Sequence, residues 1–235
     1  AYADVDRVAE VQAIHDAAQA VLRTAQGQTP VVSKAQLGLL GFDLDNADSD
    51  DATPAITNTN LSAIQQVLIN LNISGDFSAL NDFTTLATLV SDAVAAMAVI
   101  EAAAGVDDDS AITTITDIST FSDVGITTVT TSGGAAGTAN NLATLKTILA
   151  GGGITDTDAN TYEKVKAIVD SLNVVFAYAE GGATEPELGD YQTLGLNDLT
   201  TAPQLSLLNA LISSYTDGSE IDTADKLQAK ATAVN

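Results

Sequence analysis

The chain repeats one pattern of helix, glycine and helix three times. Each copy opens with a helical stretch that runs from an acidic residue to a glycine over the same number of positions: Asp4 to Gly27, Asp82 to Gly105 and Asp158 to Gly181. A short motif follows in which a glycine stands between two apolar residues, at Gly41, Gly125 and Gly195. A second apolar helical stretch comes next, near Asn60, Asn141 and Gln204. A repeat of roughly 60 to 80 residues predicts an array of similar supersecondary units.

The first stretch of each copy has the spacing of a long amphipathic helix. Apolar residues recur three and four positions apart, and two positions superimpose across the copies: Val8 with Leu86 and Tyr162, and Leu22 with Ile100 and Phe176. Acidic or hydroxyl residues at the front supply the N-cap, which for the third helix we expect to be Asp156 and Asp158. The closing glycine predicts a left-handed stop, and Gly41, Gly125 and Gly195 predict the same cap on one or two further helical turns.

These elements together predict an all-α fold, a tandem array of three small three-helix-bundle repeats with polar loops. The expected boundaries are residues 1–80, 81–157 and 158–221, with 222–235 as the start of a fourth long helix. That last segment, Asp222 to Gln228, is similar to Asn160–Lys166 and to the opening of the chain. We therefore expect either a segment of a longer array or a subunit that its neighbour completes.

Charge and composition narrow the classes of partner. The net charge is -23, from 31 acidic and 8 basic residues, which repels nucleic acid and anionic membrane surfaces and attracts divalent cations. No cysteine is present, which removes disulfides and thiolate chemistry. The longest apolar run, Ala93 to Ala104, contains Glu101 and falls short of the ~20 residues that span a bilayer, so no membrane insertion is expected.

An acidic cluster is the candidate metal site, with calcium as the expected ion. Its members are Asp43, Asp45, Asp48, Asp50 and Asp51. Alternating carboxylates offer the oxygen ligands that calcium prefers, but the spacing is not that of an EF-hand, and a solvated acidic loop is the alternative. Asp107, Asp108 and Asp109 form a second, similar run.

Nothing in the sequence favours catalysis. His15 is the only histidine, and its sister positions are Ala93 and Val169, so we interpret it as an ordinary surface residue of the first helix. The Gly151–Gly153 and Gly133–Gly134 runs lack the lysine and hydroxyl residue of a phosphate-binding loop. We expect no enzyme activity and no resident cofactor, calcium excepted.

The third copy carries a resemblance to a known family. Asp190, Tyr191, Leu194, Gly195 and Leu196, then Leu205, Leu208 and Asn209, then Ile221 to Gln228, resemble the helical tandem repeats of giant secreted bacterial adhesins, the RTX- and Bap-like surface proteins. The Val8–Ile14 stretch is similar to the start of the long helix in those repeats. The resemblance implies an extracellular location, an extension or matrix role, and calcium. It transfers no functional residue, because the matching positions are structural.

The expected function is that of a non-enzymatic structural repeat region in an extracellular bacterial surface or matrix protein, either an adhesin extension or a self-assembling filament. Its expected partners are neighbouring repeats or copies of itself, and a cell-surface or host ligand. The alternative is a binding module that holds a host protein, a glycan or an apolar ligand with its variable loops or an inter-helix groove. A hydrolase is the third hypothesis, and it requires a carboxylate pair that only the fold can bring together.

Overall fold

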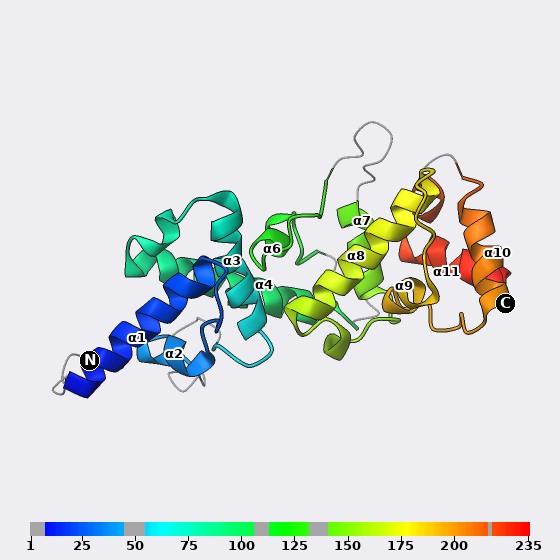
Figure 1. Ribbon diagram of the computed structural model, residues 1–235. Helices are drawn as coiled ribbons and strands as arrows, with labels where there is room; N and C mark the ends of the chain where they lie inside the picture. Colours follow the sequence, from blue (N-terminus) through cyan, green and yellow to red (C-terminus); the bar gives the residue numbers. More distant parts are fainter. Residues whose placement is uncertain (1–7, 45–54, 106–112, 132–140, 216–217) are drawn as a thin grey trace. The chain divides into compact units, whose positions relative to one another are not determined.

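The computed structural model describes residues 8–44, 55–105, 113–131, 141–215 and 218–235, and every regular element among them is a helix. The all-α fold class is therefore confirmed for the described part of the chain (Figure 1). The described residues divide into two compact units, one within Ala1–Met97 and Asp123–Gly125, the other within Ala98–Ser122 and Ile126–Asn235. The boundary at Met97 falls inside one continuous helix.

The first unit is built around one long helix and two shorter ones. Its elements are α1 (Val8–Ala25), α2 (Lys34–Leu39), α3 (Leu61–Ser74), the 3-10 turn η1 (Ser78–Leu80) and the first part of α4 (Phe83–Ala103). Helix α1 contacts both α2 and α3, as Figure 1 shows. Small and branched apolar side chains of all four helices form one core, among them Ala20, Val21, Leu37, Ile64, Leu68 and Val90.

The second unit continues the same order of elements. It holds the end of α4, then α6 (Ser119–Ser122), α7 (Asn141–Ala150), η2 (Asp156–Asp158), α8 (Tyr162–Ala179), α9 (Leu188–Thr193), α10 (Ala202–Ile212), η3 (Gly218–Ile221) and α11 (Ala224–Ala233). Helix α8 contacts α7 and α9, and α11 contacts α7, α10 and η3. Fully buried side chains include Leu145, Leu149, Ile168, Leu172 and Tyr191.

The glycine stops of the long helices are confirmed. Gly27, Gly105 and Gly181 follow α1, α4 and α8 with φ values of 69°, 79° and 89°, a left-handed conformation that glycine adopts without a Cβ clash. The start of α4 is also as expected, because the Asp82 carboxylate accepts a hydrogen bond from the Thr85 N–H at 2.9 Å. That bond lowers the pKa of Asp82. Asp4 lies outside the described residues.

The expected N-cap of the third long helix was wrong. Thr161, not Asp156 or Asp158, is the N-cap of α8, and its side chain accepts from the Lys164 N–H. Asp158 instead closes the preceding 3-10 turn, where its carboxylate accepts from the Thr155 N–H at 2.9 Å. The helix begins later than the acidic residue because the η2 turn is placed between them, and the repeat frame alone does not reveal that turn.

The short glycine motif has the same geometry in all three copies. Leu37, Phe121 and Tyr191 are each 0% exposed. Their carbonyls accept the N–H of the residue after the glycine, from Phe42 at 3.3 Å, Ile126 at 2.8 Å and Leu196 at 3.0 Å. The glycines between have φ values of 95°, 87° and 86°. This is the expected left-handed cap, with the apolar residue that follows it turned back toward the core.

The apolar part of α4 is longer than the sequence analysis expected. The helix has 21 residues with a mean hydropathy of 1.8 over its most apolar window, which by length and composition alone is enough to cross a bilayer. The expectation that no stretch approaches that length was wrong, because threonine and serine extend the apolar run on its N-terminal side. Val90, Ala93, Val94, Met97 and Ile100 of α4 are nevertheless buried within the protein, and a core helix has the same composition. The absence of membrane insertion stays a prediction.

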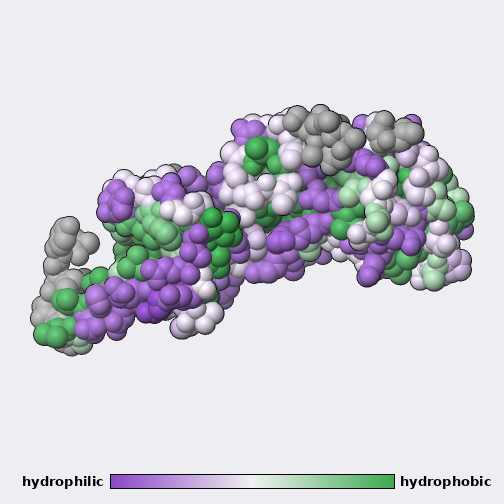
Figure 2. Space-filling view, turned by 45° about the horizontal axis from the view of Figure 1, so that its top comes forward, coloured by the Kyte–Doolittle hydropathy of each residue, from purple (hydrophilic) through white to green (hydrophobic). Residues whose placement is uncertain are grey.

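Hydrophobic residues reach the surface in several places. On the face shown in Figure 2, hydrophilic, intermediate and hydrophobic areas lie side by side. The large exposed hydrophobic side chains include Val8, Val11, Leu39, Ile73 and Leu207.

Candidate functional site

The candidate site of this protein is the set of contacts by which one copy of the repeat meets the next. The first such contact is made by the glycine motif of the second copy, at Gly125. Asn70 of α3 donates a hydrogen bond from Nδ2 to the Gly125 carbonyl at 2.9 Å. A Cβ on Gly125 would lie 2.8 Å from Cγ of Gln66, so α3 approaches this turn closely. The contact therefore requires a glycine at position 125.

The equivalent contact in the third copy joins two backbones. A Cβ on Gly195 would lie 2.9 Å from the Gly153 carbonyl carbon and 3.0 Å from its Cα. Gly153 follows α7, the last helix of the second copy, which corresponds to α3 in the first copy. The glycine motif of the second copy thus packs beside α3, the last helix of the first copy. The motif of the third copy packs beside the segment that follows α7, the last helix of the second copy.

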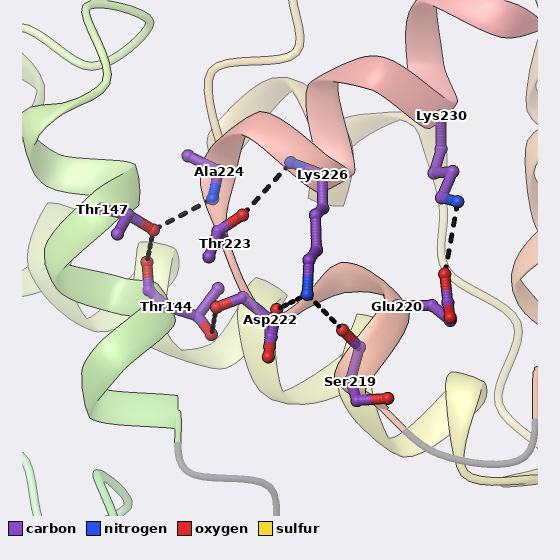
Figure 3. A network of polar contacts seen from close by, with 9 residues as sticks. All are labelled: Thr144, Thr147, Ser219, Glu220, Asp222, Thr223, Ala224, Lys226 and Lys230. Atoms are coloured by element: carbon purple, nitrogen blue, oxygen red, sulfur yellow. Dashed lines mark hydrogen bonds and ion pairs between the residues drawn. The ribbon is translucent and has the colours of Figure 1, made fainter.

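A polar network fixes α11 against α7 (Figure 3). The Thr144 hydroxyl donates to the Asp222 carbonyl at 2.6 Å, and the Ala224 N–H donates to the Thr147 hydroxyl at 2.9 Å. Thr144 is fully buried, and its hydroxyl finds its hydrogen-bond acceptor in this carbonyl. The start of the last helix is thereby held in one register.

A lysine closes the turn before α11. Lys226 Nζ lies 2.8 Å from the Ser219 carbonyl and 2.6 Å from the Asp222 carboxylate, as Figure 3 shows. Lys164 at the start of α8 bonds in the same way, to the carbonyl of Thr157 at 2.5 Å and to Oδ1 of Asn160 at 3.0 Å. The partners stand seven and four residues before the lysine in both cases. This supports the similarity between residues 222–228 and 160–166 in atomic detail. The ion pair itself is half exposed and contributes little to stability.

A buried tyrosine connects α9 to α10. The Tyr191 hydroxyl donates to Oδ1 of Asn209 at 2.6 Å, and Nδ2 of Asn209 donates to the Pro186 carbonyl at 2.9 Å. Both side chains are buried. Burial of the phenol raises the pKa of Tyr191 above its usual range, with smaller contributions from the nearby Tyr178 and Asp190. The pair is a structural bond of the third copy, because the phenol remains protonated at neutral pH.

Most of the predicted calcium site lies outside the described residues. That holds for Asp45, Asp48, Asp50 and Asp51, and also for Asp107, Asp108 and Asp109. Asp43 is described and half-buried, and its carbonyl accepts the Ile56 N–H at 2.9 Å. Within the described ranges no three acidic or histidine side chains gather where they could hold a metal ion. The calcium site stays a prediction. His15 is exposed on α1.

Two surface hollows lie beside the Gly153–Gly195 contact. One, of about 300 Å³, is lined by residues that include Asp158, Lys164 and Gln192. The other, of about 260 Å³, is lined by residues of α7, α11 and the Gly195 motif. Ligand pockets usually span ~300–1,000 Å³, so both hollows lie at or below the lower end of that range. They offer room for a small ligand at most.

Sequence reasoning missed the roles of two kinds of polar residue: the asparagines at the starts of α3 and α7, which bond to the segment before them, and Thr144 of the junction. Asn60 accepts from the Thr57 N–H at 2.8 Å and donates to the Ala55 carbonyl at 3.0 Å. Asn141 makes the same two bonds with the backbone of residues 130 and 128, at 2.6 and 3.0 Å. The repeated asparagine at the helix start was the available signal. For Thr144, the signal was a hydroxyl residue at a position that is apolar in the other copies, as Ala63 and Leu207.

The chain matches no known protein family, no curated protein and no solved structure. The class that the fold defines is thus that of an all-helical protein, and its role has to be argued from its own residues and from the repetition among them.

Proposed function

We propose that the chain is a non-enzymatic structural repeat region of an extracellular bacterial surface or matrix protein. In this proposal residues 1–80, 81–157 and 158–221 are three helical-bundle repeats, and 222–235 begin a fourth long helix. The observation that carries the proposal is the glycine motif, whose buried residue, left-handed glycine and returning N–H recur at the same spacing three times. The residues that recur serve packing and capping, and such recurrence fits a protein whose role is structural.

The contacts between copies support a structural role. Each copy is coupled to the next by a close approach to a glycine: side chains of α3 approach Gly125, and the Gly153 backbone approaches Gly195. Repeat proteins gain stability from such nearest-neighbour interfaces as well as from each unit, so coupled repeats resist separation better than units on flexible linkers. The charge of -23 keeps a concentrated array soluble and attracts cations such as calcium, which we propose bridge neighbouring copies.

The alternative of a binding module is less well supported. Its requirement is a sizeable pocket or apolar groove, and the two hollows beside Gly195 are small. The adhesin resemblance and the extracellular location belong to the main proposal, and the lack of cysteine is compatible with them.

The experiment that tests the proposal is electron microscopy of the purified chain at high concentration, with millimolar calcium and with chelator. Regular fibres or uniform rods in which a helical repeat recurs along the axis are the expected result. Fibres that need calcium would add the cation to the mechanism. Irregular particles with no repeat, together with saturable binding of a glycan or a host protein by the monomer, would favour the binding module and overturn the structural proposal.

A further inference from the structure

The larger hollow beside the Gly153–Gly195 contact has an apolar floor and a polar rim. It lies between the segment after α7, the η2 turn, the start of α8 and the end of α9, and is here called the α8–α9 hollow. Its floor includes Ile154 and Ile168, which are 3% and 2% exposed. Five polar residues outside the core form the rim: Asp158, Lys164, Gln192, Thr193 and Asn197. An apolar wall with a few converging polar groups is typical of a site for a small ligand.

The two charged side chains of the rim are held in place from one side. Oδ2 of Asp158 accepts from the N–H and from the hydroxyl of Thr155, at 2.9 and 2.5 Å. Lys164 Nζ donates to the Thr157 carbonyl at 2.5 Å and to Oδ1 of Asn160 at 3.0 Å. Oδ1 of Asp158 and the third Nζ proton of Lys164 have no partner among the described residues. Both groups therefore present one unused position to a ligand.

The uncharged side chains of the rim add donors and acceptors. Gln192 is anchored by its Nε2, which donates to the Leu199 carbonyl at 3.2 Å, so its Oε1 and second N–H are unused within the described part of the chain. The Thr193 hydroxyl and the Asn197 amide bond to none of the described residues. Amides and hydroxyls both donate and accept. Because Asp158, Lys164 and Gln192 are anchored before a ligand arrives, binding costs them little conformational entropy.

The charges of the hollow favour a neutral ligand. One carboxylate and one ammonium group line it, in a chain of net charge -23. The Thr155 hydrogen bonds lower the pKa of Asp158, and the nearby Lys164 charge adds to the effect, so the carboxylate is ionised at neutral pH. An anion that approached Lys164 would also meet Asp158 and the field of the whole protein. A cation that approached Asp158 would meet Lys164 at short range, where salt screens least.

The size and lining of the hollow select the kind of neutral ligand. Its volume of about 300 Å³ is at the lower end of ligand pockets, so it has room for one ring and not for a chain of rings. None of its lining residues is aromatic, so a flat aromatic ligand finds no ring to stack on. Hydroxyl groups match a rim of mixed donors and acceptors, because each hydroxyl donates and accepts.

We infer that the α8–α9 hollow is a binding site for a neutral polyhydroxylated molecule of one ring, a single sugar unit. The C–H groups of the ring contact Ile154 and Ile168, and its hydroxyl groups bond to the rim, where bonds to Asp158 and Lys164 are charge-assisted. The hollow opens at the surface, so the unit is either a free sugar or the end of a glycan. The site adds a function to the structural repeats and does not depend on their assembly.

The test is a titration of the isotope-labelled full-length chain with glucose, galactose and mannose, followed by NMR. For at least one sugar we expect saturable shifts in the backbone amides of Gly153, Thr193 and Asn197, and in the side-chain amides of Gln192 and Asn197. A one-ring ligand on a surface site should bind with a Kd on the order of 1 mM. An absence of saturable shifts at these positions for all three sugars would overturn the inference.

Charged analogues of the sugar that binds test the argument from charge. The uronic acid of the same ring carries a carboxylate, and the amino sugar carries an ammonium group at slightly acid pH. Each should bind at least about tenfold more weakly than the neutral sugar, because each brings a like charge close to Asp158 or Lys164. A charged analogue that binds as tightly as the neutral sugar would refute the assignment of a neutral ligand.

A disaccharide that ends in the same sugar distinguishes the two sources of the unit. Binding as tight as that of the monosaccharide would show that the hollow holds the end of a glycan. Binding at least about tenfold weaker would show that a second ring is excluded and that the ligand is the free sugar. Both results require the shifts to remain at the α8–α9 hollow, and shifts elsewhere would contradict the site.

Two matched lysines separate contact with the sugar from a structural role. Lys226 closes the turn before α11 with bonds to Ser219 and Asp222 that are equivalent to those of Lys164, as Figure 3 shows, but it lines neither hollow. Lys164→Met removes a charged donor and should weaken sugar binding at least about tenfold. Lys226→Met should leave the Kd unchanged. Equal effects of the two variants would mean that the lysine acts only through the fold, and would refute its contact with the sugar.

A second pair of variants uses the two hollows. Gln192→Ala should weaken sugar binding by a factor of about 2–10, the loss of one hydrogen bond. Gln228→Ala, in the smaller hollow, should not. Amide shifts of the helices should match those of the wild type in all four variants, which shows that they are folded. Wild-type affinity in both Lys164→Met and Gln192→Ala would place the sugar elsewhere and overturn the inference.

Discussion

The backbone contact at Gly195 leads to a sharp prediction about stability. Two glycines of the second unit have nearly the same left-handed conformation, Gly181 with φ 89° and Gly195 with φ 86°. They differ in their surroundings. No described atom lies within 4 Å of a Cβ built on Gly181, whereas a Cβ on Gly195 would approach the backbone of Gly153 to 2.9 Å. Alanine at the two positions therefore separates the conformational cost from the contact cost.

The magnitudes follow from these two terms. Gly181→Ala should cost about 1–2 kcal/mol, the penalty of a left-handed conformation for a residue with a Cβ. Gly195→Ala carries the same penalty and must also push two backbone segments apart, for which overpacking in well-packed regions suggests about 1–3 kcal/mol more. The expected loss at Gly195 is thus about 2–5 kcal/mol by the sum of the two.

Native-state hydrogen exchange is the suitable assay, because the chain has two compact units and a single melting curve does not report on one of them. The opening free energies of the α8 and α9 amides would be compared for the wild type and both variants. Both glycines belong to the same unit, so each variant is read from the same helices. Equal losses in the two variants would mean that Gly153 does not press on Gly195, and would refute the argument about this junction.

Three further predictions concern the junctions, pH and metal. Thr144→Val should remove the hydrogen bond to the Asp222 carbonyl, which costs about 0.5–1.5 kcal/mol, and α11 should exchange faster in hydrogen-exchange measurements; an unchanged α11 would contradict the network. Burial raises the pKa of Tyr191 above its ordinary value of 10.0, so the folded chain keeps a proton that the unfolded chain releases. This contribution to stability is complete below about pH 10 and is lost as the pH rises further; urea titrations at pH 8 and pH 11 should show the fall, and Tyr191→Phe should lessen it. If the acidic loop binds calcium, calorimetric titration should detect binding that Asp45→Asn with Asp48→Asn removes, and equal binding by the variant would place the ion elsewhere.

The features predicted correctly from the sequence are those that depend on nearby residues. The stops at Gly27, Gly105 and Gly181 and the caps at Gly41, Gly125 and Gly195 require only the left-handed conformation that glycine adopts freely. Hydrophobic spacing located the helices for the same reason, since one face of a helix is set by residues three and four apart. The all-α class followed from these local signals together.

The features that escaped prediction depend on contacts between distant residues. Asp158 has the composition of an N-cap, but the turn that it closes moves the helix start to Thr161. The bond from Thr144 to Asp222 joins residues 78 positions apart, and no local pattern announces it. The contacts between copies that form the candidate site could not be predicted from the sequence for the same reason, because they join residues far apart in the chain.

The burial of equivalent residues shows why members of a repeat need not share a role. The frame assigns His15, Ala93 and Val169 to one position, yet His15 is exposed and the other two are fully buried. An imidazole at a buried position would lose its hydration, whereas a small or branched apolar side chain can be buried there at lower cost. The identity of residue 15 therefore matches the exposure of this face of α1, while Val8 and Leu22 keep the apolar character of their buried equivalents in α4 and α8.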